Sequence, residues 1–397
     1  MDEYVRIGVE YFKVANRPLS SGDTSKTLLK WRQGAITTDK GSEFLKNIKK
    51  YDGFVTIPSN DNYQKEIKGF YNKYEETNHS FKKGLFPQTE NFLKHIFGDQ
   101  YELGLDYLTI LWRFPEEILP ILCLVSSERK TGKTTFLNWL KLVFQGNMTI
   151  NKNEDFRSRF NLDWTSKLII AVDEVLLDRK EDSERLKNLS TSRSYKTEAK
   201  GVDKIEDVFF GKFILCSNNE NNFIVIDKQE IRYWVRKLPT LSDSDENPNL
   251  LDDLRGELKY FMHFIKTREM VSPKKTRMWF TKEQVYTDAL GNLIQGSKTT
   301  LNKEITELIK DRFILFDVDE LKYTSGDIVD ILGETKIRTR KSEVAEVLRS
   351  SFSLEDKNGS YTKYVNVDYT NDGKIYVEKL SSKGRYFTFL KKDLEAD

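Results

Sequence analysis

The segment from Ser127 to Thr134 has the residue types and spacing of a phosphate-binding loop. Against the pattern G-x-x-x-x-G-K-[ST] it matches at Gly132, Lys133 and Thr134, and departs at Ser127, where the pattern has its first glycine. In such a loop, backbone N–H groups and a helix N-terminus bind an anion. We therefore expect Lys133 to neutralise the β- and γ-phosphates of a nucleoside triphosphate, and the Thr134 hydroxyl to bind Mg²⁺. The alternative is an ordinary glycine-containing turn. The residues expected to contact the nucleotide are Ser127, Glu128, Arg129, Lys130, Thr131, Gly132, Lys133, Thr134 and Thr135.

Two consecutive carboxylates, Asp173 and Glu174, follow a second apolar run about forty residues after the loop. Asp173 is expected to hold Mg²⁺ through water, and Glu174 to orient and deprotonate the attacking water. Acidic pairs at strand ends are also common in solvated turns. The order of the two motifs favours binding of ATP or another nucleoside triphosphate, with Mg²⁺.

A third apolar run ends in Asn218, and a basic segment follows it. Asn218 is expected to hydrogen-bond the attacking water or the γ-phosphate. Arg232 or Arg236 would reach the γ-phosphate bound by a neighbouring subunit and stabilise the charge that develops in phosphoryl transfer. For each arginine alone, the alternative is a surface residue on a basic strand.

The elements that must position these residues are visible in the apolar pattern. Runs at 120–125, 164–174 and 213–218 predict buried strands, and 135–144 predicts the helix after the loop. Spacing of apolar residues by three and four predicts helices over 89–97 and 104–112. A helix is also expected over 250–265, after an acidic, turn-rich break. The expected class is α/β with a parallel sheet.

The order of loop, Asp-Glu strand, basic segment, Ser-Asn strand and arginine resembles a superfamily 3 helicase. It is most similar to the helicase half of the primase-helicases of phages, large DNA viruses and mobile elements. The resemblance runs over about residues 70–240. It departs at Ser127, and at Ile231-Arg232, where the family often has paired arginines. It implies an AAA+-type P-loop ATPase core that acts as a DNA helicase in a homo-hexamer.

In that family a basic hairpin grips single-stranded DNA in the central channel of the ring. The corresponding segment here is 186–204, and Lys200-Gly201 matches the hairpin tip. The residues that the resemblance implies as DNA contacts are Lys196, Lys200 and Lys204.

The remainder of the chain is expected to form two further domains. Residues 1–104 resemble a largely helical collar that holds subunits in a ring, and 105–271 form the motor. No primase signature of spaced acidic residues is evident, so any priming activity is expected from a separate polypeptide.

In 272–397, helices at 300–310, 324–332 and 341–350 precede strands at 364–369, 374–378 and 385–389. This α+β pattern suggests a winged-helix-like module, in which Arg338, Arg340 and Lys341 contact DNA. A packing or oligomerisation domain is the alternative.

Composition excludes several other classes. Lys and Arg total 64 and Asp and Glu total 62, so DNA contacts must come from local patches. Cys123 and Cys216 lie in predicted buried strands, which argues against disulfides or zinc. Three scattered histidines make a histidine metal site unexpected. There is no signal pattern or long apolar run, so we expect a soluble, cytoplasmic protein without a membrane partner. The resemblance implies that a phage or mobile element encodes it and that it acts in a bacterial host cell.

Two other functions fit the same motifs. One is a ring ATPase that remodels proteins. The other is a replication initiator or regulatory DNA-binding protein, in which nucleotide acts as an assembly switch and the C-terminal module does the main work.

Overall fold

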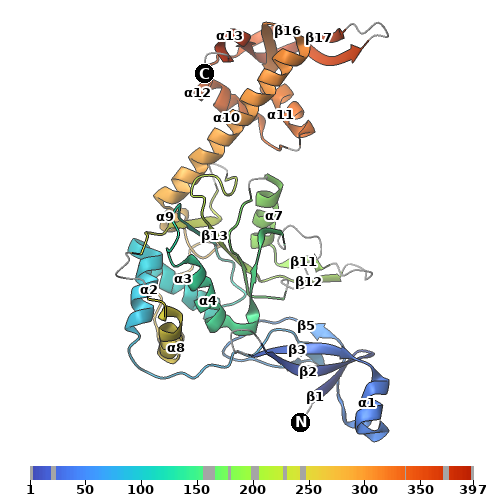
Figure 1. The fold of residues 1–397 in the computed structure, drawn as a ribbon, viewed down its shortest axis with the longest axis vertical. Helices are drawn as coiled ribbons and strands as arrows, with labels where there is room; N and C mark the ends of the chain where they lie inside the picture. The colour runs from blue at the N-terminus through green and yellow to red at the C-terminus, as the bar shows by residue number, and fades with distance from the viewer. Residues whose placement is uncertain are drawn as a thin grey trace. The chain divides into compact units, whose positions relative to one another are not determined.

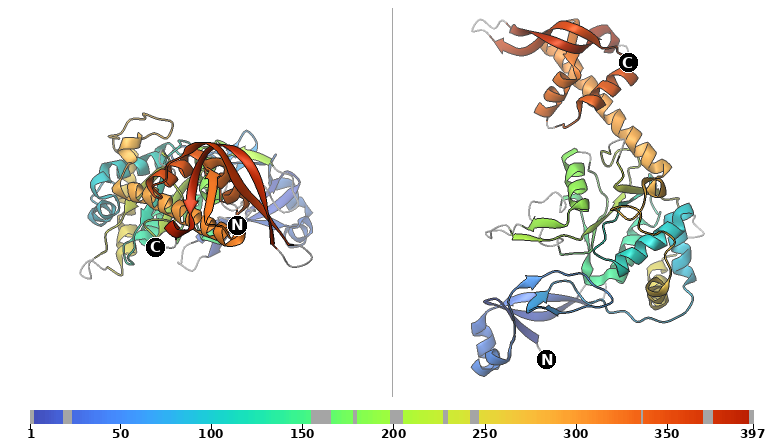
Figure 2. Two further views of the ribbon diagram at one scale, coloured as in Figure 1. Left: turned by 90° about the horizontal axis from the view of Figure 1, so that it is seen from above. Right: turned by 180° about the vertical axis from the view of Figure 1, so that it is seen from behind.

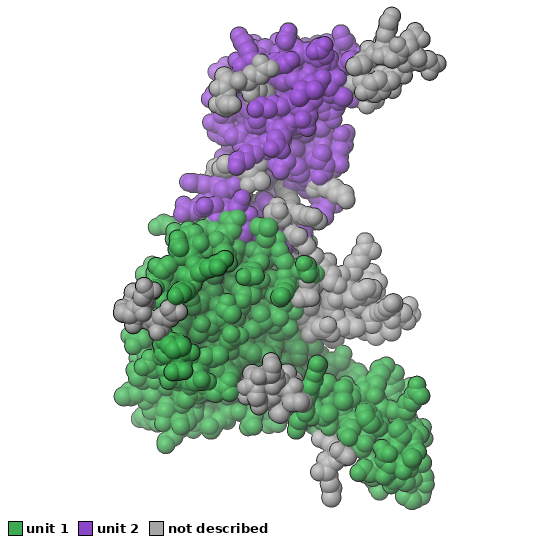
Figure 3. Space-filling view, in the orientation of Figure 1, with its two compact units in different colours: residues 1–176, 185–220, 230–290 green, residues 177–184, 221–229, 291–397 purple. Residues whose placement is uncertain are grey.

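A computed structural model describes residues 3–18, 24–154, 166–177, 180–197, 205–226, 230–241, 247–335, 337–369 and 375–394. The chain divides into two compact units (Figure 3). Unit 1 comprises residues 1–176, 185–220 and 230–290, and unit 2 comprises residues 177–184, 221–229 and 291–397. No helix of the described residues is both long and apolar enough to span a membrane.

The first seventy residues of unit 1 are mainly β-structure. Four strands form a sheet in the order β3-β2-β1-β4, and three short strands form a second sheet in the order β5-β7-β6. Between β3 and β4 lie the helix α1 (Gln33–Lys40) and the 3-10 helix η1 (Ser42–Asn47). The strands are β1 (Glu3–Ile7), β2 (Glu10–Pro18), β3 (Thr24–Trp31), β4 (Lys49–Tyr51), β5 (Phe54–Val55), β6 (Glu66–Ile67) and β7 (Phe70–Asn72).

The prediction of a largely helical collar over 1–104 is wrong for these strands. The reason is that the apolar residues of these strands lie on both faces, so the alternation of apolar and polar residues that marks a half-buried strand is not evident. In β1, Val5 and Ile7 join one apolar cluster, whereas Tyr4, next to Val5 in the chain, joins another with Ile36 and Ile48. Successive side chains of a strand point to opposite faces, so this sheet is covered on both sides.

Helices cover the central sheet of unit 1 and complete its core. They are α2 (Pro87–Phe97), the 3-10 helix η2 (Gly98–Gln100), α3 (Tyr101–Arg113), α4 (Lys133–Phe144), α8 (Leu250–Thr267) and the short α9 (Lys282–Val285). The helices predicted at 89–97, 104–112, 135–144 and 250–265 are thus confirmed. One large apolar cluster joins Leu122 and Leu124 of the sheet to Phe136 and Leu140 of α4 and to Phe261 of α8.

The central sheet is five-stranded and all-parallel, in the order β14-β8-β13-β10-β9. Its middle strand, β13, is labelled in Figure 1. Its three middle strands are fully buried, as parallel strands covered on both faces must be. The α/β class with a parallel sheet is therefore confirmed. The strands are β8 (Ile121–Val125), β9 (Met148–Asn151), which follows the 3-10 helix η3 (Gln145–Asn147), β10 (Ile169–Val172), β13 (Lys212–Ser217) and β14 (Tyr233–Lys237).

A two-stranded ribbon lies between β10 and β13 in the sequence, after helix α7 (Lys180–Thr191). It consists of β11 (Ser194–Thr197) and β12 (Ile205–Val208), paired antiparallel with Ser194 opposite Val208. Within the segment 186–204 that resembles the family's basic hairpin, the described residues 194–197 form the first strand of this ribbon, and 198–204 lie outside the described residues.

Among its described residues, unit 2 contains three antiparallel strands and three main helices. The order along the chain is α10 (Asp288–Phe316), β15 (Glu320–Thr324), α11 (Ser325–Glu334), α12 (Lys341–Ser350), β16 (Lys357–Tyr369), β17 (Ile375–Leu390) and the short α13 (Lys391–Leu394). The sheet order is β15-β17-β16. Ile309 and Phe313 of α10, Ile328 of α11, Leu348 of α12 and Phe389 of β17 share one core.

Three boundaries in unit 2 differ from the prediction. The strand predicted at 364–369 begins seven residues earlier, as β16 (Lys357–Tyr369). The helix predicted at 300–310 is part of the longer α10. The strands predicted at 374–378 and 385–389 are one strand, β17, because the turn-like segment 381–384 pairs with residues 359–362 of β16. Figure 2 shows the resulting long hairpin.

Candidate functional site

The loop between β8 and α4 has the local geometry that its glycine predicts. Gly132 takes a left-handed φ of 81° just before the first turn of α4, and Lys130 takes a φ of 56°. Glycine adopts such angles without strain. A Cβ at Gly132 would also lie 3.2 Å from the Phe92 ring. The left-handed angles fall at these two positions and not at Ser127, which explains why serine is accommodated there.

Lys133 and Thr134 begin α4 and reach in different directions. The Lys133 ammonium donates a hydrogen bond to the Thr131 hydroxyl at 3.0 Å, and its side chain is buried. Burial lowers the pKa of Lys133, although Cys216, Asp173 and Glu220 act in the opposite direction. The Thr134 hydroxyl donates to the Asp173 carboxylate at 3.1 Å. This last contact joins the two predicted motifs across 39 residues.

Asp173 and Glu174 follow β10 on a strained turn. Glu174 has a φ of 54°, which costs free energy for a residue with a side chain. Its backbone N–H donates to the Asp173 carboxylate at 3.0 Å, and the Glu174 side chain is exposed. Strain of this kind clusters at functional sites because the surroundings must hold it.

Asn218 lies at the same edge of the sheet as the loop and the acidic pair. Its strand, β13, is hydrogen-bonded to β8 on one side and β10 on the other, with Ser217 opposite Val125. The Ser217 hydroxyl donates to the Val175 carbonyl at 2.9 Å, which ties the end of β13 to the acidic turn. Asn218 itself is exposed. The carboxyl ends of β8, β10 and β13 therefore gather Lys133, Asp173, Glu174 and Asn218.

The arginines predicted for catalysis lie elsewhere in the chain's own fold. Arg232 precedes β14 at the amino edge of the sheet, where its carbonyl accepts from the Ile121 N–H. Its guanidinium donates to both oxygens of the buried Glu230 at 2.9 Å. Arg236 pairs with Asp99 at 2.9 Å and donates to Gln100. Both arginines thus have hydrogen-bond and ion-pair partners in their own subunit. A role for either of them in the site of a neighbouring subunit stays a prediction.

Three residues at the loop were missed from the sequence. The Ser127 N–H donates to the Glu220 carboxylate at 2.6 Å, and Glu220 pairs with Lys237 at 2.7 Å. Burial raises the pKa of Glu220, but the bonds from Lys237 and Ser127 outweigh burial and hold that pKa below its usual range. His95 of α2 lies with Nε2 3.0 Å from the Thr131 carbonyl. Glu220 follows directly on Ser217-Asn218-Asn219, whereas no sequence signal marks His95.

The predicted DNA contacts are only partly described. Lys196 lies in β11 opposite Glu206, while Lys200 and Lys204 lie outside the described residues. In unit 2, Arg338, Arg340 and Lys341 are exposed at the start of α12.

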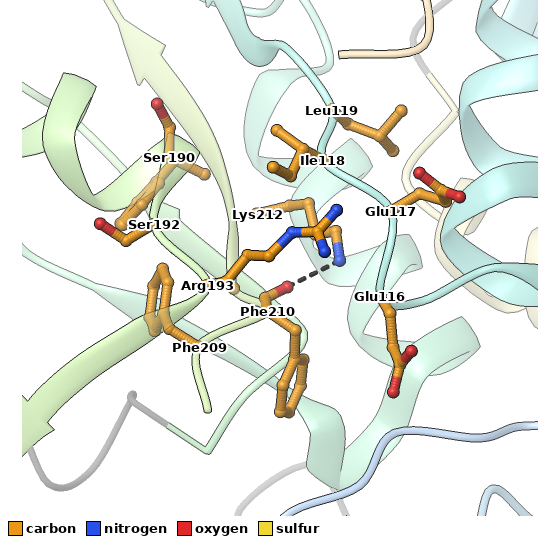
Figure 4. Close-up of a pocket in the computed structure, with 12 residues that line it drawn as sticks. Glu116, Glu117, Ile118, Leu119, Ser190, Ser192, Arg193, Phe209, Phe210 and Lys212 are labelled. Atoms are coloured by element: carbon orange, nitrogen blue, oxygen red, sulfur yellow. Dashed lines mark hydrogen bonds between the residues drawn. The ribbon is translucent and has the colours of Figure 1, made fainter. Parts of the chain in front are cut away.

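A small pocket of unit 1 lies away from the phosphate loop, where the chain enters β13 (Figure 4). Its wall includes Glu116, Glu117, Arg193 and Lys212. The buried Lys212 ammonium donates to the carbonyls of Phe210 and Pro115, so this lysine fastens the start of β13 to the segment before β8. We assign it a structural role.

The oxygen atoms at the carboxyl edge fit a magnesium ion. Mg²⁺ in nucleotide sites takes one or two protein oxygens together with phosphate oxygens and water. The Thr134 hydroxyl and the Asp173 carboxylate provide two such oxygens side by side. Within the described residues, no group of three or more His, Cys, Asp or Glu side chains forms a site for a metal ion.

The fold and the loop together are consistent with a core of the phosphate-loop type. Residues 124–236 match a family of unknown function (DUF5906). No curated protein matches the chain.

Among solved structures, the fold is similar to the apo C-terminal region of NrS-1. The TM-score is 0.59 at 13% identity, and the match covers 97% of this chain and 95% of that chain. An A form of the same region gives 0.57 at 14% identity, over 97% and 96%. A JCV helicase bound to an acetamide compound aligns over 55% of this chain and 61% of its own at 13% identity, and its TM-score of 0.31 is too low to establish a shared fold. The chain therefore shares its overall fold with the NrS-1 C-terminal region.

Proposed function

We propose that this chain is an ATP-dependent DNA helicase of the superfamily 3 type, which translocates on single-stranded DNA as a hexameric ring during replication of a phage or mobile element. The observation that carries the proposal is the hydrogen bond between Thr134 and Asp173. It brings the phosphate loop and the acidic pair together at the carboxyl edge of an all-parallel sheet, where ligands of open α/β sheets bind.

Each residue has a role that follows from its position. When nucleotide binds, the Lys133 ammonium at the N-terminus of α4 would exchange its hydrogen bond to Thr131 for contacts with the phosphates. The negative charge of the phosphates would then stabilise the ammonium form, although burial lowers the pKa of Lys133. Glu174 would orient the attacking water and accept its proton, and Asn218 would hydrogen-bond that water or the γ-phosphate. Mg²⁺, held through Thr134 and Asp173, supplies neutralisation of phosphate charge when bound.

One strand offers a route from hydrolysis to DNA movement. The buried β13 ends at Ser217 beside Asn218, and the residues before it lead directly from β12 of the ribbon. A rigid strand that joins the site to the ribbon transmits a shift at one end to the other. We propose that the ribbon, with Lys196, Lys200 and Lys204, contacts single-stranded DNA.

A second candidate function is supported by unit 2. The order helix, strand, helix, helix, strand, strand, with β17 between β15 and β16, supports the proposal of a winged-helix-like module. Arg338, Arg340 and Lys341 are exposed at the start of α12, which would be the recognition helix of such a module. We propose that this unit binds DNA, which would also suit a replication initiator.

The deciding test is ATP hydrolysis by the full chain, with and without single-stranded DNA. Wild-type protein is expected to show hydrolysis that DNA stimulates, and Lys133→Ala to lose it. Lys94→Ala, which removes an exposed lysine of α2, is the matched control and should behave as wild type. Hydrolysis indifferent to DNA would contradict the helicase and favour a protein-remodelling ATPase. Absence of hydrolysis, with sequence-specific duplex binding, would favour the initiator.

A further inference from the structure

We infer that His95 of helix α2 is a positioning residue of the phosphate loop, which orients a loop peptide so that its N–H faces the bound phosphates. The Nε2 atom of His95 lies 3.0 Å from the Thr131 carbonyl, across 36 residues of sequence. A carbonyl oxygen can only accept a hydrogen bond, so Nε2 must carry the proton and donate it. The histidine is thus a donor to the backbone of the loop.

This hydrogen bond fixes the direction of the next N–H group. A trans peptide holds its C=O and its N–H on opposite sides of the chain, and no cis peptide bond occurs among the described residues. Because the Thr131 carbonyl is turned toward α2, the Gly132 N–H points away from α2. No described group accepts a hydrogen bond from this N–H, which is therefore available for a phosphate oxygen.

The preceding peptide is held in the same way. The Lys130 carbonyl accepts from the Leu241 N–H at 3.2 Å, so the Thr131 N–H is turned to the opposite side. Lys130 and Gly132 both have a left-handed φ, whereas Thr131 between them does not. Alternation of this kind arranges successive N–H groups into a concave surface that binds anions. Two hydrogen bonds from outside the loop therefore preorganise it for phosphate.

The packing of α2 against the loop brings the histidine into place. A Cβ at Gly132 would lie 3.2 Å from the Phe92 ring and 3.9 Å from Cδ2 and Nε2 of His95. Phe92 and His95 are three residues apart in α2, so both side chains lie on the helix face that meets the loop. The buried Phe92 supplies the apolar part of this contact, and the half-buried His95 supplies the hydrogen bond.

The inference deepens the proposed function, because it concerns how the same loop binds phosphates. It rests on nucleotide binding alone, and not on hydrolysis, DNA or assembly. His95 acts through the Thr131-Gly132 peptide. Without the histidine this peptide is free to rotate, so part of the binding free energy must be used to orient it.

The test measures the affinity of the full chain for a fluorescent ATP analogue, by titration in the presence of Mg²⁺. We expect His95→Ala to weaken binding roughly three- to tenfold, the effect of losing one hydrogen bond that preorganises the loop. His95→Gln should stay within about twofold of wild type, because its amide nitrogen reaches about as far from the backbone as Nε2. His95→Asn has a side chain one methylene shorter and should bind as weakly as His95→Ala.

The matched control is His263→Ala. This variant removes a half-buried histidine of α8 whose ring has no described hydrogen bond, so binding should equal that of wild type. The Gln and Asn variants guard against a folding defect, because both replace the ring by an amide and differ in reach. An Asn variant that binds as tightly as the Gln variant would overturn the inference, as would an Ala variant that binds like wild type.

Inorganic triphosphate separates the loop from the rest of the nucleotide site. Its competition with the analogue should weaken in His95→Ala by the same factor as binding of the analogue, because the loop contacts phosphates alone. Equal competition in wild type and variant would assign His95 to the base or the sugar and overturn the inference.

This outcome is separable from that of the proposed function. Nucleotide binding that His95→Ala weakens, in a chain without ATP hydrolysis, would uphold the positioning role and reject the helicase. DNA-stimulated hydrolysis with unchanged affinity in His95→Ala would do the reverse. A wild-type chain that binds neither the analogue nor triphosphate would overturn both.

Discussion

At the level of single residues, Glu174 differs from the other members of the site. Lys133 is hydrogen-bonded within its own loop and Thr134 to Asp173, whereas the Glu174 side chain is exposed on a backbone with a left-handed φ. The Glu174 carboxylate therefore follows directly on Asp173, which accepts the Thr134 hydrogen bond, and none of the described hydrogen bonds or ion pairs uses the Glu174 side chain. A general base is expected to have these properties.

We predict that Glu174→Gln abolishes ATP hydrolysis and preserves nucleotide binding. Loss of a general base lowers the rate by roughly 10²- to 10⁴-fold, while the loop amides and Lys133 still bind the phosphates. Steady-state hydrolysis and titration with a fluorescent ATP analogue measure the two effects. Glu43→Gln, at an exposed ion pair in the N-terminal region, is the control. Normal turnover in the Glu174 variant would reject the assignment.

At the level of elements, β13 is held in place at both of its ends. All of its residues are buried. Its first residue, Lys212, donates a hydrogen bond to the Phe210 carbonyl, and its last residue, Ser217, donates one to the Val175 carbonyl in the acidic turn. Burial lowers the pKa of Lys212 to about 7, although Glu116 and Glu117 act to raise it. Burial of the charged form of Lys212 should therefore lower the free energy of unfolding of unit 1 at pH values where this amine is protonated.

We predict that unit 1 becomes more stable between pH 7 and pH 9. In the unfolded chain Lys212 titrates near its ordinary pKa of about 10.4, so across this window the unfolded state binds more protons than the folded state. The free energy of unfolding then rises with pH, by an amount on the order of 1–3 kcal/mol. Well below pH 7 Lys212 is protonated in both states and this contribution stays constant.

Lys212→Met should remove most of that rise. Tryptophan fluorescence during urea unfolding reports on unit 1, because all six tryptophans belong to it. Burial also lowers the pKa of Lys141, to about 8, so Lys141→Met serves as the comparison and accounts for the residual slope. An unchanged pH dependence in the Lys212 variant would contradict the role of the buried amine.

At the level of the whole molecule, assembly decides whether the arginines take part in catalysis. Arg232 is paired with Glu230 at the amino edge, and Arg236 with Asp99 and Gln100. Either arginine would have to give up these partners to reach the γ-phosphate of a neighbour. In the proposed ring, the contact of the arginine with the γ-phosphate must therefore compensate for the loss of its ion pair with Glu230 or Asp99.

We predict that ATP and Mg²⁺ convert the Glu174→Gln variant into a hexamer, whereas the nucleotide-free chain remains smaller. Binding between subunits stabilises the assembly by mass action. Light scattering after size exclusion measures the mass. Arg232→Ala and Arg236→Ala, compared side by side, should show one variant that assembles but does not hydrolyse ATP. If both hydrolyse ATP normally, a trans arginine at these positions is excluded.

The sequence alone determined the features that depend on local chemistry. A glycine before a lysine and threonine specifies a tight turn into a helix, and apolar runs specify the buried strands that end at Asp173 and Asn218. These depend on backbone geometry and burial within a few residues, so a single chain reveals them.

Tertiary structure decided what depends on contacts between distant segments. Glu220 meets Ser127 and Lys237 because β13, β8 and β14 are neighbours, and His95 meets Thr131 through the packing of α2. The parallel pairing of β14 with β8 places Arg232 at the edge of the sheet opposite the phosphate loop. The spacing of residues in the sequence does not reveal this position. The N-terminal strands were missed because their two-sided burial blurs the alternation that marks an ordinary strand. Strand order and helix packing are set by the whole core, so these neighbours appear only once the chain is folded.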